Sequence, residues 1–325
     1  MMKLLEVRDL KIKFYTSLGV AEAVRGISFD VEKGEILGIV GESGSGKSVT
    51  GLAIMDLLDR NKGVKVDGEI LYKGKNILKM TEKEVCDWRG SKISMIFQEP
   101  SSALNPVMSV ENQLREVYEI HQPEKAKHCH LQLVDLLRRL HIIEAEKVLK
   151  QYPFELSGGM KQRIVIAMSV LAGPELIIAD EPTTALDVTT QAEILSLLQE
   201  IQKETGCAVI FITHDLGVIA EIAREVMVMY RGLVMERSPV KQFFENAKHP
   251  YSKDLLASRL ENFDGSFRKI PGSIPDAYEP MEGCAYYGRC AEADAGCRNQ
   301  FPMLTAVDDH QVRCFRYNGR GRCNE

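Results

Sequence analysis

The chain has 325 residues, of which 45% are hydrophobic and 27% charged, with a formal net charge of −5. This length suits one large α/β domain with a smaller appendage, and the acidic balance excludes a broad basic surface, so no nucleic-acid partner is expected. No apolar run approaches the roughly 18 residues of a membrane helix and the first residues do not resemble a signal peptide, so we expect a cytosolic chain that reaches a membrane only through a partner.

The first part of the chain contains the signals of several strands. Residues 3–14 alternate apolar and charged side chains, which predicts a half-buried strand. A second strand is expected near Ala23–Val31, and the apolar run Ile36–Val40 predicts a buried one. A helix should run from Lys47 to about Leu58, and Val64–Leu71 is typical of a return strand.

The middle of the chain alternates helix and strand signals. Residues 108–150 are typical of helices, and another helix is expected over Gly159–Leu171. A buried strand over residues 176–180 precedes a helix at Thr189–Glu204, and Cys207–Thr213 predicts a further buried strand. Such alternation predicts a parallel sheet with functional residues at the carboxyl ends of its strands.

The composition changes after about residue 238. Proline and glycine become frequent and regular periodicity fades. We therefore expect a main domain over residues 1–240 and a small, irregular extension over residues 241–325.

A phosphate-binding loop follows the strand that ends at Val40. It has the pattern G-x-x-x-x-G-K-S, and its glycines permit a tight curl whose N–H groups point inward toward an anion. Lys47 would reach the β- and γ-phosphates, and the Ser48 hydroxyl would hold Mg²⁺. An ordinary glycine turn is the alternative, but the flanking strand and helix favour nucleotide binding. The residues assigned to the nucleotide are Gly41, Glu42, Ser43, Gly44, Ser45, Gly46, Lys47, Ser48 and Val49.

Two acids end the strand over residues 176–180. Asp180 would orient Mg²⁺, usually through water, and Glu181 is placed to polarise the attacking water at the γ-phosphate. The alternative is a pair of solvated acids at a strand end.

A second anion site is expected where Ser157, Gly158 and Gly159 open a helix. One subunit does not need two phosphate cradles far apart in sequence, so this loop is interpreted as completing the site of another subunit. A simple helix cap is the alternative.

In this order, the motifs resemble those of the nucleotide-binding subunit of ATP-binding-cassette (ABC) transporters, over residues 4 to about 240. The matching segments are residues 41–48, Gln98 in Ile96-Phe97-Gln98-Glu99-Pro100, Leu156–Met160, Asp180-Glu181, Ala185-Leu186-Asp187 and His214. The resemblance implies an α/β P-loop NTPase fold with an N-terminal antiparallel β subdomain and a helical subdomain over about residues 99–172. It also implies a dimer that closes over two ATP molecules.

The resemblance assigns further roles by position. Gln98 contacts Mg²⁺ or the attacking water, Asp187 lies in the loop that crosses the dimer interface, and His214 contacts the γ-phosphate. Phe14 or the adjacent Tyr15 stacks on adenine.

One departure from the family pattern is visible in the serine-glycine motif. Met160 stands where the family commonly has glutamine. Hydrolysis is still expected, because the contacts to the γ-phosphate come from Ser157 and Gly159.

Five of the eight cysteines crowd into the tail, at positions 284, 290, 297, 314 and 323, and the first four of these lie close together in the sequence. The spacing matches neither the short C-x₂₋₄-C of zinc sites nor common ferredoxin runs. A metal site, reduced thiols without a ligand, and disulfides all remain open from the spacing, although a cytosolic location disfavours disulfides.

The surrounding residues resemble a C-terminal extension of peptide-transporter ATPases. The matching segments are His249-Pro250-Tyr251 and Ile270–Pro275, followed by the cysteines. This resemblance implies a metal-binding extension in which Cys284, Cys290, Cys297 and Cys314 hold a [4Fe–4S] cluster. Cys323 would remain free.

These features predict the ATP-hydrolysing subunit of a di- or oligopeptide ABC importer. It would lie on the cytoplasmic side of the membrane and pair with a second ATPase subunit, identical or related. The pair would dock on two permease subunits fed by an extracytoplasmic binding protein. The alternatives are import of nickel or another small solute, a soluble ABC-type clamp acting on DNA, and an ATP-gated electron-transfer protein.

Overall fold

The structure is a computed structural model that describes residues 3–59, 62–184, 186–259 and 270–317. Ala185 and Cys323, both named above, lie outside these described residues. The chain divides into two compact units, described separately below. The helical unit comprises residues 32–35 and 79–211, and the sheet unit comprises residues 3–31, 36–78 and the described residues from 212 onward.

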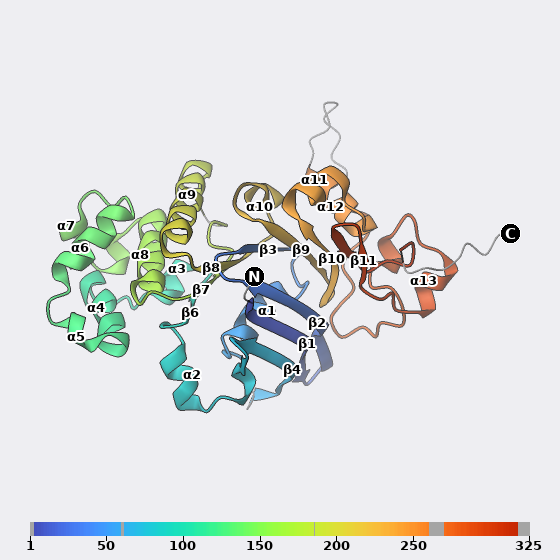
Figure 1. Cartoon of the computed structure of the whole chain (residues 1–325), viewed down its shortest axis with the longest axis horizontal. Coiled ribbons are helices and arrows are strands. Elements are labelled where there is room, and N and C mark those ends of the chain that lie inside the picture. The colour runs from blue at the N-terminus through green and yellow to red at the C-terminus, as the bar shows by residue number, and fades with distance from the viewer. Residues whose placement is uncertain (1–2, 60–61, 185, 260–269, 318–325) are drawn as a thin grey trace. The chain divides into compact units, whose positions relative to one another are not determined.

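The sheet unit contains a four-stranded antiparallel sheet in the order β2-β1-β4-β5 (Figure 1). Its strands are β1 (Lys3–Thr16), β2 (Gly19–Glu32), β4 (Val64–Tyr72) and β5 (Lys75–Asn76). The pairing of β1 with β4 shifts between Arg8 and Lys11. Gly68 lies opposite this irregularity, where an added Cβ would come within 2.5 Å of the Asp9 carbonyl oxygen. The strand predicted from the alternation of residues 3–14 is confirmed as β1, and the antiparallel subdomain that the family resemblance implied is confirmed by this sheet.

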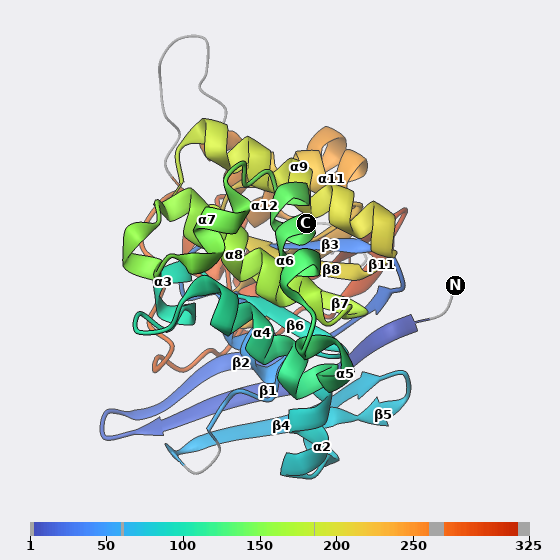
Figure 2. The same ribbon diagram turned by 90° about the vertical axis from the view of Figure 1, so that its left-hand side faces the viewer.

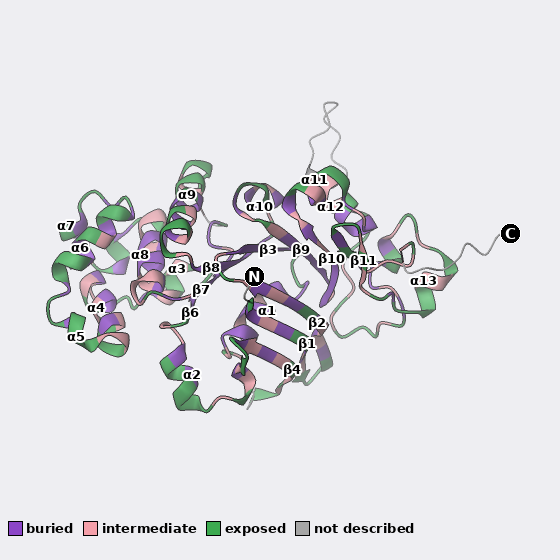
Figure 3. Cartoon of the chain, viewed as in Figure 1, coloured by how far each residue is buried: buried purple, intermediate pink, exposed green. Residues whose placement is uncertain are grey.

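A second set of strands in the sheet unit carries the phosphate loop. The strands are β3 (Ile36–Val40), β9 (Glu225–Tyr230), β10 (Leu233–Pro239), β11 (Thr305–Val307) and β12 (His310–Val312). β3 pairs with β9 in parallel, while β10 pairs antiparallel with both β9 and β12. The tail thus adds β12 and β11 to the edge of β10. Strand β3 is buried throughout, as its uninterrupted apolar run predicts (Figure 3).

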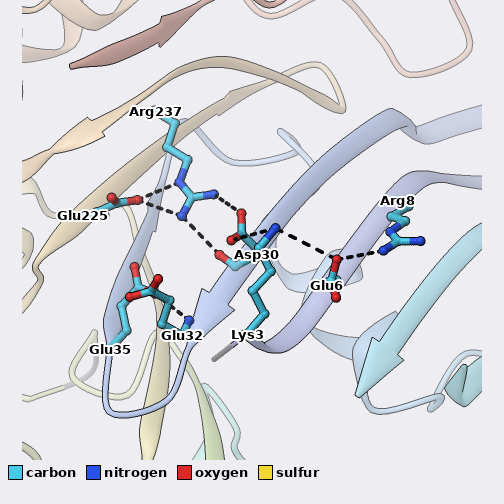
Figure 4. Close-up of polar contacts among 8 residues, drawn as sticks. All are labelled: Lys3, Glu6, Arg8, Asp30, Glu32, Glu35, Glu225 and Arg237. Atoms are coloured by element: carbon cyan, nitrogen blue, oxygen red, sulfur yellow. Dashed lines mark hydrogen bonds and ion pairs between the residues drawn. The ribbon is translucent and has the colours of Figure 1, made fainter. Parts of the chain in front are cut away.

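Arg237 of β10 connects the two sheets of this unit (Figure 4). Its guanidinium donates to the Glu225 carboxylate on β9 at 2.7 Å and to the Asp30 carboxylate on β2 at 3.1 Å. Lys3 lies 3.5 Å from Asp30 and 4.0 Å from Glu6. Because the Arg237 side chain is only 13% exposed, its fork of donors holds β2 against β9 and β10 more firmly than a solvated ion pair would.

The helices of the sheet unit are short. They are α1 (Lys47–Ile54), α10 (Leu216–Ile222), α11 (Val240–Asn246), α12 (Pro250–Arg259), the 3₁₀ turn η4 (Tyr287–Arg289) and α13 (Ala295–Asn299). Helix α1 ends earlier than the predicted Leu58, because Asp56 has a positive φ of 50° that no α-helix can continue through.

The helical unit combines a small parallel sheet with a bundle of helices (Figure 2). Its strands are neighbours in the order β8-β7-β6, with bounds Ala208–Thr213, Leu176–Asp180 and Ile93–Ile96; β8 begins in this unit, which ends at Phe211. The helices are α2 (Glu82–Trp88), α3 (Pro100–Ala103), α4 (Val110–His121), α5 (Pro123–Ala126), α6 (His130–Arg139), α7 (Ala145–Lys150), α8 (Gly158–Leu171) and α9 (Val188–Thr205).

The helical stretch predicted over residues 108–150 is four helices, α4 to α7. Pro123 separates α4 from α5, because the residue before a proline is pushed out of the helical region. That residue, Gln122, has φ −146° and ψ 62°. Among the described residues, no helix is long and apolar enough to cross a membrane.

Candidate functional site

The phosphate loop joins the buried strand β3 to helix α1, as its motif predicts. Gly46 lies at the N-cap of α1 with a left-handed backbone (φ 99°), and no side chain caps this helix end. The first N–H groups of α1 are therefore directed toward the loop, where they suit an anion. The Lys47 side chain is buried and donates from Nζ to the carbonyl oxygens of Gly41 (2.8 Å) and Glu42 (3.0 Å).

Two of the loop's glycines are required by close backbone approaches. A Cβ on Gly41 would lie 2.2 Å from the Met229 carbonyl oxygen, and a Cβ on Gly46 would lie 2.5 Å from that of Ala23. Gly44 also has a positive φ (76°), but nothing lies within 4 Å of its Cβ position. Strands β9 and β2 therefore shape the two ends of the loop, while its tip at Ser43 and Gly44 is exposed.

Glu181 and Gln98 lie together in the helical unit. Asp180, the last residue of β7, is buried, and Glu181 follows with a positive φ of 46°. The Glu181 carboxylate accepts a hydrogen bond from Gln98 Nε2 at 3.3 Å and one from the Thr184 hydroxyl at 2.8 Å, both on Oε2. A left-handed backbone at a non-glycine residue is strained and concentrates at functional sites. This geometry holds the carboxylate in one orientation.

The serine-glycine loop begins helix α8. The Ser157 hydroxyl accepts a hydrogen bond from the Met160 N–H at 3.3 Å, so it acts as the N-cap of that helix. Gly158 has no atom within 4 Å of its Cβ position, whereas a Cβ on Gly159 would approach Thr190 Cγ2 to 2.8 Å. The helix-cap interpretation is thus realised, and it is compatible with an anion site because the helix N-terminus stays exposed at Gly158.

Asp187 caps helix α9 at an exposed position. Its carboxylate accepts the Thr190 N–H at 3.0 Å and the Thr190 hydroxyl at 2.8 Å. These hydrogen bonds lower the pKa of Asp187, the backbone one most strongly. The N-terminus of α9 is therefore capped by a charged side chain.

The remaining residues predicted from the motifs lie in the sheet unit. His214 is exposed immediately after β8, where Asp215 begins helix α10 by accepting the Gly217 N–H at 2.7 Å. Phe14 pairs with Val64 and is partly buried, whereas Tyr15 is 52% exposed. Exposure therefore favours Tyr15 over Phe14 as the ring that a ligand could reach.

The C-terminal extension contacts the phosphate loop, which the sequence did not reveal. Arg289 donates to both oxygens of the Glu42 carboxylate, at 2.7 and 3.1 Å, and the Tyr251 hydroxyl accepts the Glu42 N–H at 3.0 Å. No spacing rule marks residues 247 positions apart. Cys290, the neighbour of Arg289, belongs to the cysteine pattern of the tail, but that pattern does not predict this contact.

The four tail cysteines line one cavity of about 270 Å³. Burial raises the pKa of Cys284 to about 12 and that of Cys290 to about 11, with the neighbouring thiols contributing. Burial likewise raises the pKa of Cys314. Within the described ranges, however, no group of three or more His, Cys, Asp or Glu side chains is arranged to hold a metal ion. The expected metal-binding character of the extension therefore does not follow from this geometry, although the thiols do converge.

Comparison with known proteins supports the motif assignment. A family model described as "ABC transporter" matches residues 24–184, and one described as "Oligopeptide/dipeptide transporter, C-terminal region" matches residues 235–297. The dipeptide transport ATP-binding protein DppD of Bacillus subtilis is 45% identical over 323 residues, which cover 98% of this chain and 96% of that protein. The probable peptide ABC transporter ATP-binding protein y4tR of Sinorhizobium fredii is 44% identical over 319 residues, covering 97% and 95%.

Solved structures agree with the fold. The structure of cbiO1 from Clostridium perfringens, part of the ABC transporter complex cbiONQ, is 30% identical with a TM-score of 0.63, covering 76% of this chain and 92% of that one. A dimeric bacterial ABC transporter cassette is 25% identical with a TM-score of 0.63, covering 73% and 98%. These likenesses confirm the expected ABC ATPase fold, and the full-length relatives establish that this chain belongs to the family of ATP-binding subunits of peptide ABC transporters.

Proposed function

We infer that this chain hydrolyses ATP to power the import of di- or oligopeptides through an ABC membrane transporter. The observation that carries this function is the phosphate loop, in which Lys47 is buried at the open N-terminus of α1. The match of residues 235–297 to the oligopeptide/dipeptide transporter C-terminal region supports peptides as the cargo class. The relatives named for dipeptide and oligopeptide transport support it too.

ATP would bind with its phosphates on residues 41–49. Lys47 would exchange its carbonyl acceptors for the β- and γ-phosphates, since a lysine ammonium gains more from a phosphate than from neutral carbonyls. Ser48 and Asp180, with Gln98, would hold Mg²⁺, which prefers oxygen ligands. Tyr15, or Phe14, would stack on the adenine ring.

Glu181 would act as the general base for the attacking water. The two hydrogen bonds that it accepts fix the direction of its carboxylate, which general-base catalysis requires. His214 would contact the γ-phosphate as charge develops on it in the transition state. No covalent intermediate is needed, because phosphoryl transfer relies on positioning and electrostatics.

A second ATPase subunit, identical or related, would complete each site. Ser157, Gly158 and Gly159, together with Asp187, would face the nucleotide held by the partner's phosphate loop. The relative described as a dimeric ABC transporter cassette supports this arrangement. The pair would lie peripherally on the cytoplasmic face of the membrane, bound to two permease subunits that receive cargo from an extracytoplasmic binding protein.

The other interpretations are less well supported. Nickel or another small solute would use the same machinery, but the relatives are named for peptides. A DNA clamp would insert a long coiled coil between the phosphate loop and Ser157. The described helices in that interval are short, and the longest, α4, has 12 residues. An electron-transfer role would need a second redox centre beside the single cluster that the tail cysteines could hold.

The four tail cysteines would hold a [4Fe–4S] cluster. The observation in support is that all four side chains line one cavity. Because burial raises the pKa values of Cys284 and Cys290, a bound metal would have to displace their thiol protons. A cluster would supply a cross-link between segments that have little core of their own. It would have no part in ATP hydrolysis.

The function can be tested in proteoliposomes that contain the chain with its partner ATPase and permeases. ATP-dependent uptake of a radiolabelled dipeptide is expected, with Lys47→Ala eliminating both uptake and ATP hydrolysis. ATP hydrolysis that drives nickel uptake but no peptide uptake would overturn the assignment of the cargo. Retention of ATP binding by Lys47→Ala would overturn the nucleotide site.

A further inference from the structure

The C-terminal extension holds the phosphate loop at Glu42. The Arg289 guanidinium forms a two-pronged ion pair with the Glu42 carboxylate, at 2.7 and 3.1 Å. The Arg289 side chain is 6% exposed and that of Glu42 is 27% exposed, so water screens this pair only partly. Such bidentate geometry fixes direction as well as distance.

Arg289 is itself held rigidly within the sheet unit. Its Nε donates to the Pro271 carbonyl oxygen at 2.7 Å, and Nη1 lies 3.3 Å from the Tyr230 hydroxyl. The guanidinium also lies 5.7 Å from the ring centre of Tyr230 and 5.9 Å from that of Tyr286. Burial opposes the charged form, but the hydrogen bonds to Glu42 and Tyr230 outweigh it and raise the pKa of Arg289.

Tyr251 makes a second contact with the same loop residue. Its hydroxyl accepts the Glu42 N–H at 3.0 Å, and the side chain is fully buried. Its ring centre lies 4.7 Å from that of Tyr230 and 5.1 Å from that of Tyr286. The extension therefore holds both the side chain and the backbone of Glu42.

These contacts extend to the lysine of the loop. The carbonyl oxygens of Gly41 and Glu42 accept hydrogen bonds from Lys47 Nζ, as does the Ser45 hydroxyl at 3.4 Å, so the orientation of Glu42 influences where that ammonium lies. We propose that Arg289 and Tyr251 are positioning residues that hold Glu42 and so preorganise the phosphate loop for ATP. The cysteine-bearing extension thereby sets the affinity of the ATP site, an inference that rests on the proposed function.

The expected effect is on binding more than on turnover. A loop that is not held must be ordered when ATP binds, which weakens affinity. Arg289→Met should raise the Kd for ATP by about fivefold or more, the lower range of measured coupling between sites. Because Arg289 touches no reacting atom, kcat at saturating ATP should change less than KM. Arg289→Lys keeps the charge but loses the fork, so it should recover part of the affinity.

The experiment measures ATP binding to the full chain by calorimetry for wild type, Arg289→Met, Glu42→Gln and the double variant. If the pair acts as a unit, the double variant should lose less affinity than the product of the two single losses. Arg316→Met is the matched control, because Arg316 forms an exposed ion pair with Glu292 in the same extension. It should bind ATP as the wild type does.

Hydrogen exchange provides a second readout. The amides of Tyr287, Arg289 and Cys290 donate to carbonyl oxygens within the 3₁₀ turn and its flanks. By linkage, ATP should slow their exchange in the wild type and do so less in Tyr251→Phe, which removes only a hydroxyl. If Arg289→Met fails to fold by near-ultraviolet circular dichroism, Arg289→Lys and Tyr251→Phe carry the test.

The inference is overturned if a folded Arg289→Met binds ATP with the wild-type Kd. It is also overturned if the losses of ATP affinity in the double variant simply multiply, or if ATP leaves the hydrogen exchange of the 3₁₀-turn amides unchanged in the wild type. The proposed function is tested separately by Lys47→Ala. If that variant loses ATP while Arg289→Met does not, only the inference fails. If both bind ATP as the wild type does, the nucleotide site itself is wrong.

Discussion

Gln98 donates a hydrogen bond to the Glu181 carboxylate at 3.3 Å, although 83 positions separate them in the chain. The Thr184 hydroxyl donates to the same oxygen at 2.8 Å, and Glu181 has a left-handed backbone. A left-handed backbone at a non-glycine residue destabilises the fold, and a surface acid without a function would need neither this strain nor two donors. A carboxylate that must point in one direction for a reaction needs both, so Glu181 is the residue on which catalysis is best tested.

Glu181→Gln should reduce ATP turnover by about 10²–10⁴-fold, the usual contribution of a general base. The amide retains the shape of the carboxylate, so ATP binding should persist and the ATP-bound dimer should accumulate. Phosphate release and size-exclusion chromatography with ATP, alone and with the partner ATPase, measure both effects.

Glu200→Gln is the control for Glu181→Gln, because Glu200 lies in the same unit and its carboxylate accepts a hydrogen bond from Ser196 within α9. It should hydrolyse ATP at the wild-type rate. Wild-type turnover by Glu181→Gln would refute the general base, and a strictly monomeric ATP-bound protein would refute the shared site.

Gly46→Ala should weaken ATP binding and lower the free energy of unfolding by about 1–3 kcal/mol. Alanine is strained at the left-handed backbone of this position, and its Cβ would clash with a neighbouring carbonyl oxygen. Its φ is 99° and its Cβ would lie 2.5 Å from the Ala23 carbonyl oxygen. Calorimetry with ATP and denaturant unfolding measure the two losses.

Gly206→Ala separates the clash from the strain. Gly206 also has a positive φ, 64°, but nothing lies within 4 Å of its Cβ position. The free energy of unfolding of Gly206→Ala should fall by about 1 kcal/mol, because alanine is strained at a left-handed helix C-cap. The ATP affinity of this variant should stay that of the wild type. Equal losses of ATP affinity in the two variants would show that the contact with β2 is unimportant.

Local patterns predicted much of the fold, because their physical causes are local. The alternation in β1 and β4 and the continuous apolar run of β3 record which faces are buried. The β9–β10 hairpin was missed, although a signal was present: Arg231-Gly232 separates two apolar runs, and both residues have the positive φ of a tight hairpin turn.

Contacts between distant segments could not be predicted in this way. Two such contacts are the pairing of β12 with β10 and the ion pair between Arg289 and Glu42. Each depends on how the tail folds back onto the sheet. Nothing in the residues around Arg289 distinguishes it from other arginines of the tail. The candidate site was therefore predictable where a contiguous motif builds it, as in the phosphate loop, and not where the extension supports it.

Cys290→Ser should remove the visible absorbance expected of anaerobically purified protein, because a [4Fe–4S] cluster needs four thiolate ligands. Cys86→Ser is the control, since Cys86 is exposed and lies on α2, outside the extension. Absorbance spectra with iron and sulfide analysis provide the measurement. A colourless wild type that contains zinc, or neither iron nor zinc, would refute the iron assignment.

His249 should make the protein less stable in mild acid. The ring is 1% exposed, burial lowers its pKa to about 3, and Nδ1 accepts the Tyr251 N–H, which requires the neutral form. Between about pH 6.5 and 3 the unfolded chain binds a proton on this histidine that the folded chain does not. The stabilising contribution is therefore complete above pH 6.5 and declines as the pH falls, by at most about 1.4 kcal/mol per pH unit.

His249→Asn tests that contribution, because the amide oxygen of asparagine can accept the same N–H without titrating. In denaturant titrations, the unfolding free energy of the wild type should fall more between pH 7.5 and pH 4.5 than that of His249→Asn. The exposed His128, replaced in His128→Asn, should leave the pH profile of the wild type unchanged. Parallel profiles for wild type and His249→Asn would mean that burial does not hold this ring neutral.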